Sequence, residues 1–88
     1  MDGECYLCGK WASLERHHVF YGIGLRKQSE KYGAVVNLCH DCHNEPPGGV
    51  HFDQEIDVWL KGVFQKKLMA LYDWTTDDFI SRFGRNYL

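Results

Sequence analysis

Cys39-His40-Asp41-Cys42 repeats the spacing of an earlier segment, Cys5-Tyr6-Leu7-Cys8. Each Cys-x-x-Cys turn presents two thiolates on one side, and zinc accepts four ligands in a tetrahedron. The chain between the two turns is long enough for a hairpin to leave one turn and return to the other. The two turns together predict one structural zinc, bound by Cys5, Cys8, Cys39 and Cys42.

The alternative fates of these cysteines are two disulfides or four free thiols. Met1-Asp2-Gly3-Glu4 leads straight into the first turn, so we expect no signal peptide. No stretch approaches the roughly 20 apolar residues that a membrane span requires. We therefore expect a cytoplasmic protein without a membrane partner. In a reducing compartment, paired Cys-x-x-Cys turns are typical of metal binding rather than of disulfides.

The composition predicts one small globular domain, residues 1–88, whose modest core a metal would help to hold together. Hydrophobic residues make up 44% of the chain and aromatic residues 15%, which indicates a packed globule rather than disorder. The formal net charge of −2 argues against strong non-specific binding to DNA. Any phosphate contact must come from a local patch, for which the candidates are Arg16, Arg26 and Lys27.

The histidines and cysteines are confined to the first part of the chain. All five histidines and all four cysteines lie within the first 51 residues, and neither type occurs after them. We interpret residues 1–52 as the chemical module and residues 53–88 as its helical support. If the cysteines hold zinc, the pair His17-His18 and the later His43 and His51 are free to bind a second metal. A purely structural role for these histidines is the alternative.

Local patterns predict the elements that carry these residues. Leu14 to Tyr21 and Ala34 to Leu38 are typical of strands, and the polar segment between them is a loop or a short helix. Asp53 is a good N-cap for a long helix that extends to Tyr72, and Thr75 or Thr76 caps a last short helix that stops at Gly84. The apolar face predicted for the long helix comprises Ile56, Trp59, Leu60, Val63, Phe64, Leu68, Leu71 and Tyr72.

The ordered set of motifs resembles the HNH nuclease family. The matching segments are Cys5-x2-Cys8, His17-His18-Val19, Asn37-Leu38-Cys39-x2-Cys42-His43 and His51. The layout is similar to that of small HNH-type proteins encoded by bacteriophages and prophages, which implies a bacterial cytoplasm as the location. The resemblance implies an α+β fold, in which a zinc-stapled, treble-clef-like ββα-metal module precedes a long helix and a short terminal helix.

The resemblance also implies a role for each matching residue in a metal-dependent DNA endonuclease. His18 matches the general base of the family, and Asn37 matches the asparagine that orients this base. His17, His43 and His51 match ligands of a catalytic divalent metal, which could be Mg²⁺, Mn²⁺, Ni²⁺ or Zn²⁺. One or more of Arg16, Arg26 and Lys27 would then hold a phosphate that flanks the scissile bond.

Two features of the chain depart from the family pattern. Neighbours on a strand point to opposite faces, so His17 and His18 serve one centre only if the backbone bends or the phosphate lies between them. The segment Pro46-Pro47-Gly48-Gly49 interrupts the helix that usually carries the last ligand, so His51 must come from a loop or from the start of the next element.

Other functions fit the same motifs. A non-catalytic zinc module would bind a protein or a nucleic acid, and within that class the negative charge favours a protein partner. An inactive regulator that keeps the HNH fold is a third possibility. The aromatic residues of the helical half, Trp59, Phe64, Trp74 and Tyr87, could serve a homodimer or a phage partner, although core packing is their commoner fate.

Overall fold

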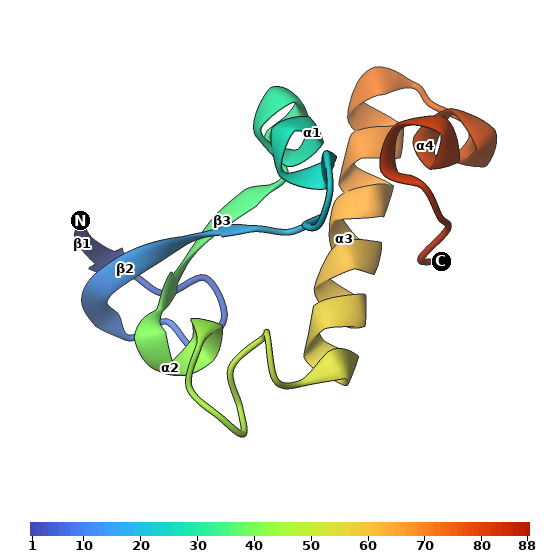
Figure 1. The fold of residues 1–88 in the computed structure, drawn as a ribbon. Helices are drawn as coiled ribbons and strands as arrows, with labels where there is room; N and C mark the ends of the chain where they lie inside the picture. The colour runs from blue at the N-terminus through green and yellow to red at the C-terminus, as the bar shows by residue number, and fades with distance from the viewer.

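A three-stranded antiparallel sheet and a long helix dominate the computed structural model, which describes residues 1–88 (Figure 1). The α+β class expected from the sequence is thus confirmed. The strand order is β1-β2-β3, with His17 of β2 opposite Val36 of β3. In chain order the elements are β1 (Asp2–Glu4), β2 (Trp11–His18), α1 (Leu25–Tyr32), β3 (Val35–Cys39), α2 (His40–His43), α3 (Gln54–Tyr72) and α4 (Thr76–Phe83).

The strands differ from the sequence prediction at their ends. β2 begins at Trp11, earlier than expected, because its first residues pair with β1. β1 has only three residues, too few to show any periodicity in the sequence. β2 ends at His18, so the segment after it leaves the sheet and turns into α1. The polar segment between the predicted strands is therefore a helix rather than a loop.

α1 is fixed to the end of β2 by a buried hydroxyl. Ser29 accepts a hydrogen bond from the N–H of Phe20 at 3.1 Å and donates one to the carbonyl of Phe20 at 2.7 Å. Gly24 and Gly33 flank the helix, with φ values of 78° and 77° that favour glycine. These contacts set which residues of α1 stand opposite β2.

The two C-terminal helices begin and end as their capping residues predict. Asp53 accepts hydrogen bonds from the N–H groups of Glu55 and Ile56, which confirms it as the N-cap of α3. Of the two candidate caps for α4, Thr75 is the one used, and it forms a capping box with Asp78. α4 ends at Gly84, where φ is 89°.

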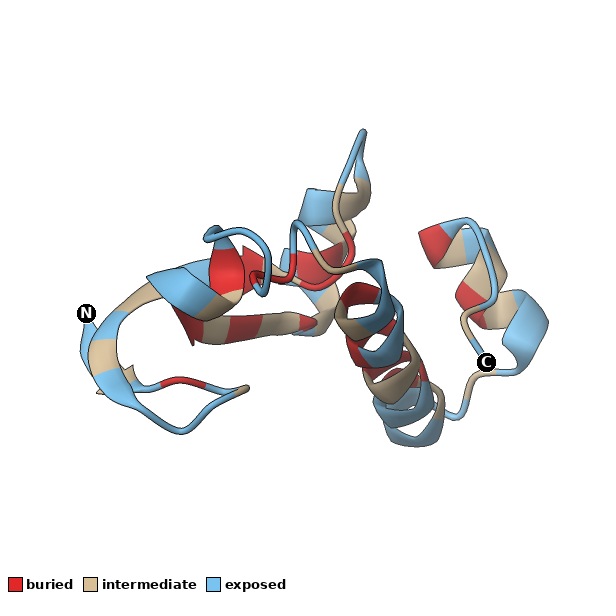
Figure 2. Ribbon diagram, turned by 90° about the horizontal axis from the view of Figure 1, so that it is seen from below, coloured by how far each residue is buried: buried red, intermediate tan, exposed pale blue.

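The buried side of α3 differs from the predicted stripe. Leu60, Phe64 and Leu68 are buried as expected, and Figure 2 shows the buried positions along one side of the helix. The predicted members Trp59, Leu71 and Tyr72 are exposed instead. The buried side also takes in polar residues one helical turn apart, which the apolar pattern could not indicate, namely Asp57, Lys61 and Gln65.

Aromatic packing joins the segment after β2 to α4. The ring of Phe20 lies 4.4 Å from that of Phe83 and 5.5 Å from that of Phe79, measured between centroids. Such pairs combine large apolar burial with favourable ring geometry. In Figure 1, α1 and α4 both lie beside the C-terminal end of α3. None of the helices combines the length and the apolar character that crossing a bilayer requires.

Candidate metal centres

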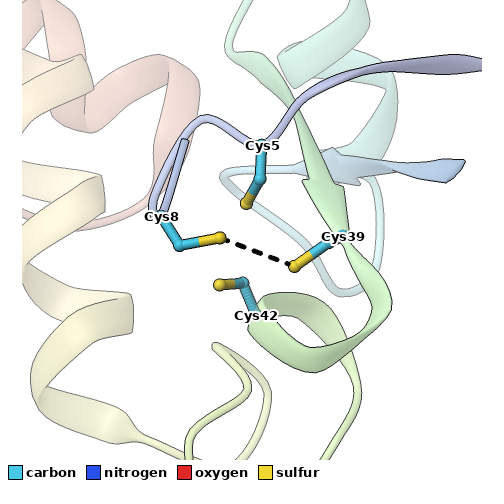
Figure 3. Close-up of side chains that lie close together, drawn as sticks. All are labelled: Cys5, Cys8, Cys39 and Cys42. Atoms are coloured by element: carbon cyan, nitrogen blue, oxygen red, sulfur yellow. Dashed lines mark hydrogen bonds between the residues drawn. The ribbon is translucent and has the colours of Figure 1, made fainter. Parts of the chain in front are cut away.

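Four cysteine side chains converge where the two Cys-x-x-Cys turns meet (Figure 3). Cys5 and Cys8 come from the loop after β1, Cys39 ends β3, and Cys42 lies in α2. None forms a disulfide, and the four sulfur atoms lie within 4.8 Å of one another. The Cys8 and Cys39 sulfurs are 3.8 Å apart. With a Zn–S bond of about 2.3 Å, a tetrahedral site has S···S edges of about 3.8 Å, so the cluster could hold one structural zinc.

Two of the thiols, those of Cys5 and Cys42, have pKa values shifted in opposite directions. Burial opposes ionisation of Cys5, but hydrogen bonds from the backbone of Cys39, Cys8 and Leu7 outweigh it and lower the pKa of Cys5 to about 6. Burial raises the pKa of Cys42, as do its contacts with the other three sulfurs. Without a metal, one thiolate is thus stabilised by its neighbours. A metal ion would favour deprotonation of the remaining thiols.

Three histidines form a second cluster. His17 comes from β2, His43 ends α2, and His51 lies in the loop before α3. One ring nitrogen from each lies within 4.8 Å of the others, and the Nε2 atoms of His43 and His51 are 3.1 Å apart. The Nε2 atom of His17 is buried and has no hydrogen-bond partner. Of the four histidines singled out in the sequence, the three expected as ligands are therefore brought together.

His51 reaches this cluster from a loop, which hydrogen bonds tie to α2. The N–H of Val50 donates to the carbonyl of Cys42 at 2.7 Å, and that of His51 donates to the carbonyl of His43 at 3.3 Å. The same short helix therefore carries Cys42 of the thiol cluster and positions two of the three histidines. Both clusters are therefore held by α2 and by the loop that is hydrogen-bonded to it.

A carboxylate that the sequence analysis did not single out fixes His43. Glu15 accepts a hydrogen bond at 2.8 Å from Nδ1 of His43, and its other oxygen lies 3.1 Å from Nδ1 of His40. A carboxylate only accepts, so Nδ1 of His43 carries the proton and the lone pair of Nε2 faces the cluster. Glu15 precedes His17 by two residues on β2, and strand alternation was the one signal that could have placed them on the same face.

Burial disfavours a positive charge on two members of the cluster, His17 and His51. Burial, with smaller contributions from the neighbouring His43 and His51, lowers the pKa of His17 to about 3. Burial and the proximity of His43 also lower the pKa of His51. Neutral imidazoles offer lone pairs, so both rings are ready to ligate a cation near neutral pH.

His18 lies on the opposite face of β2, against a carboxylate of α1. Nε2 of His18 lies 2.8 Å from Oε1 of Glu30. Arg16 donates to both oxygens of Glu30, at 2.8 and 2.7 Å, and these bonds, followed by the one from His18, lower the pKa of Glu30 to about 2. Asn37, predicted to orient His18, makes no such contact. Its Oδ1 is buried without a partner, and it lines a separate hollow beside Tyr6.

His17 and His18 nevertheless border the same cavity, because they lie at the very end of β2. The cavity has a volume of about 320 Å³. Arg26 lies on its wall without an ion-pair partner, whereas Lys27 is exposed outside it. The lining residues are Arg16, His17, His18, Tyr21, Arg26, His43, Asn44 and His51.

A buried ion pair contacts Tyr21, one of the residues that line this cavity. The Lys61 ammonium lies 2.7 Å from Asp57 and 4.1 Å from the centre of the Tyr21 ring. Burial raises the pKa of Tyr21 to about 12, and Asp57 contributes in the same direction, so Tyr21 keeps its hydroxyl proton. Lys61 also adds to the lowering of the pKa of His17. The helical half thus contributes to the electrostatics of the site, which its apolar pattern did not suggest.

Comparison with known proteins adds no relative to this picture. No family model, no curated protein and no solved structure matches the chain. A functional assignment therefore depends on the two clusters, the cavity and the order of the motifs.

Proposed function

We propose that this protein is a metal-dependent endonuclease of the HNH type, which hydrolyses phosphodiester bonds in DNA. The observation that carries the proposal is the buried Nε2 of His17, which has no partner and lies beside the ring nitrogens of His43 and His51. A buried polar atom without a hydrogen bond costs about 1–3 kcal/mol. Three imidazole nitrogens that converge at one point suit a cation, which would bind all of them at once.

The donor set fits a catalytic rather than a closed structural metal. His17, His43 and His51 supply three ligands, which leaves at least one position for water or substrate. With metal–nitrogen bonds of about 2.0–2.1 Å, a tetrahedral site has N···N edges of about 3.3 Å, close to the 3.1 Å between His43 and His51. When bound, a divalent ion supplies positive charge where charge develops on the phosphate and on its leaving oxygen.

His18 is the residue that we assign as general base. It borders the cavity beside the proposed metal ligands but belongs to neither cluster. A histidine can accept a proton near neutral pH. In the proposed step, the oxygen of a water molecule bonds to phosphorus and the bond from phosphorus to the 3′ oxygen breaks. The proton of the water passes to His18, and the 3′ oxygen takes up a proton from solvent.

Arg26 is the best candidate for a contact with a flanking phosphate. It lines the cavity and has no acidic partner, whereas Arg16 is engaged by Glu30. Lys27, the next residue in the chain, lies outside the cavity. This local positive charge is compatible with the overall net charge of −2, because phosphate contacts act over short distances in salt.

A plasmid-nicking assay with Mg²⁺, Mn²⁺, Ni²⁺ and Zn²⁺ tests the activity. We expect His18→Ala to lower the cleavage rate at least about 100-fold, because a general base contributes that much or more. Zinc content and circular dichroism should stay as in the wild type, since His18 belongs to neither cluster. Cleavage by His18→Ala at the wild-type rate would show that His18 is not the base.

The phosphate contact has a matched control on the same helix. We expect Arg26→Ala to raise KM for DNA and to reduce the salt dependence of binding, since one charge contact is lost. Lys27→Ala removes the same charge from an exposed position outside the cavity and should have the smaller effect. Equal effects of the two substitutions on KM would assign Arg26 to the general charge of the surface.

A non-catalytic zinc module is the second candidate. The 3.1 Å contact between His43 and His51 can also be a simple hydrogen bond, which needs no ion. α3 exposes Val58 and Trp59, and the negative net charge favours a protein as the partner. Metal stoichiometry separates the two functions. Two metal sites per chain favour the nuclease, and a single zinc favours the module.

A further inference from the structure

The attachment of α1 to the end of β2 places Glu30 opposite His18. The buried hydroxyl of Ser29 binds both backbone groups of Phe20, which fixes the register between α1 and the end of β2. The next residue, Glu30, is thereby placed against the side chains of Arg16 and His18. All three side chains have their polar atoms within 2.8 Å of a partner. Chain register rather than chance proximity therefore sets this contact.

The contact determines which nitrogen of His18 is available. Glu30 is ionised at ordinary pH and can only accept hydrogen bonds, so Nε2 of His18 must carry the ring proton. The structure gives Nδ1 of His18 no hydrogen-bond partner, and the side chain borders the cavity with 23% of its surface exposed. Nδ1 is thus the ring atom with a free lone pair.

We propose that Glu30 is a positioning residue, which holds the ring of His18 with its proton on Nε2 and leaves Nδ1 to take up the proton of the attacking water. This inference rests on the proposed nuclease function. In the step, the O–H bond of the water breaks and its proton forms a bond with Nδ1. Glu30 stays ionised, and its negative charge stabilises the imidazolium that results.

Arg16 acquires a supporting role in this arrangement. Its two parallel hydrogen bonds orient Glu30 and keep the carboxylate ionised. All three groups are partly exposed, so the pair contributes little to folding. If Glu30 had only a structural role, its replacement would change the stability of the protein and leave the tautomer of His18 unchanged. The two roles predict different measurements.

The first measurement is independent of activity. Long-range ¹⁵N–¹H spectra of the zinc-loaded protein report which nitrogen of a neutral histidine is protonated. For His18 we expect the Nε2–H form in the wild type and a shift toward the Nδ1–H form in Glu30→Ala. Lys31→Ala, which changes the next residue of α1, should leave the spectrum of His18 as it is. An unchanged tautomer in Glu30→Ala would overturn the proposal.

The second measurement uses DNA cleavage. We expect Glu30→Ala to lower kcat at least about tenfold with little change in KM. Glu30→Gln, which keeps an acceptor oxygen, should restore part of the loss. In a His18→Ala background, Glu30→Ala should have no further effect, because it acts through His18. A further loss in that background would overturn the positioning role.

The two measurements also separate this inference from the nuclease function. A wild-type protein that cleaves no DNA with any of the four metals would contradict the nuclease function and, with it, any role for Glu30 in that reaction. The spectra would still decide whether Glu30 sets the tautomer of His18. A normal nuclease whose His18 tautomer ignores Glu30→Ala would contradict the positioning role alone.

Discussion

At the scale of single residues, the imidazole of His17 is buried at a cost in stability. It is 1% exposed, and its Nε2 has no hydrogen-bond partner. Burial also forbids it a positive charge, because its pKa is lowered to about 3. A site that keeps such a group in place lowers the stability of the metal-free fold, and a bound cation would recover that loss.

Acid should therefore destabilise the wild type through His17. Below the ordinary histidine pKa of 6.5 the unfolded chain binds a proton there, whereas the folded chain does not until about pH 3. The free energy of unfolding should thus fall as the pH drops from 6.5, by at most about 1.4 kcal/mol per pH unit from this group. Urea denaturation of zinc-loaded protein between about pH 7 and pH 5.5 measures the slope.

His17→Leu supplies the comparison for this prediction. It removes the titrating group and the unpaired nitrogen, so its unfolding free energy should depend less on pH than that of the wild type. His51 and Cys5 are present in both proteins, so their contributions to the pH dependence cancel in the difference. Added Mn²⁺ should stabilise only the wild type. Identical slopes for the two proteins would show that His17 is not held neutral by the fold.

Residue type alone allowed the two side-chain clusters to be predicted, but not the residues that support them. Cysteine and histidine are rare and chemically specific, so Cys39 or His17 stands out in a sequence. Glu15 and Glu30 are ordinary acidic residues until the fold brings each within 2.8 Å of a histidine. Asn37 illustrates the reverse case, because the hydrogen bond expected from the family pattern is absent.

At the scale of elements, the loop between α2 and α3 decides whether the histidine cluster forms. It contains Pro46-Pro47-Gly48-Gly49 and positions His51 through backbone hydrogen bonds to α2. A Cβ atom on Gly49 would lie 2.8 Å from the nitrogen and 2.9 Å from the oxygen of Glu45, closer than real contacts allow. A Cβ atom on Gly48 would meet nothing within 4 Å.

Alanine at these two adjacent glycines should have opposite outcomes. Gly49→Ala forces the loop away from Glu45, so His51 should be displaced and the affinity for the second metal should fall by about tenfold or more. Gly48→Ala should bind that metal as the wild type does. Calorimetric titration of zinc-loaded protein with Mn²⁺ measures both. Equal affinities in the two variants would mean that the loop tolerates the shift without moving His51.

Elements with strong local signals were predicted well, and those set by tertiary contacts were not. Asp53, Thr75 and Gly84 delimit their helices through hydrogen bonds within a few residues, which the sequence alone displays. β1 exists only because β2 pairs with it. The same holds for the buried Lys61, whose position depends on its partner Asp57 and on Tyr21.

At the scale of the whole molecule, one small hydrophobic core extends from the cysteine cluster to the helical end. Only 20 of the 88 residues are buried, so hydrophobic packing alone gives a modest margin of stability. A structural zinc would add on the order of 10 kcal/mol, comparable to the entire stability of such a domain. The long helix α3 is the element that links the two ends, because the loop with His51 leads into it and α4 packs on it (Figure 1).

Leu60 tests this link, because it is fully buried on α3 between Asp57 and Phe64. We expect Leu60→Ala to lower the unfolding free energy by about 2–5 kcal/mol, through lost apolar burial and the cavity left behind. Lys66→Ala, on an exposed position of the same helix, should change it by less than about 0.5 kcal/mol.

The same substitution shows whether the helical half supports the metal sites. Loosening α3 at Leu60 should also disturb Asp57 and Lys61, which stand behind Tyr21 and the cavity. We therefore expect Leu60→Ala to weaken the second metal site more than the cysteine cluster, whose ligands all come from residues before α3. Denaturation curves followed by tryptophan fluorescence, together with metal content, measure both effects. If Leu60→Ala unfolds at the same denaturant concentration as Lys66→Ala, α3 is not packed on the rest of the molecule as described.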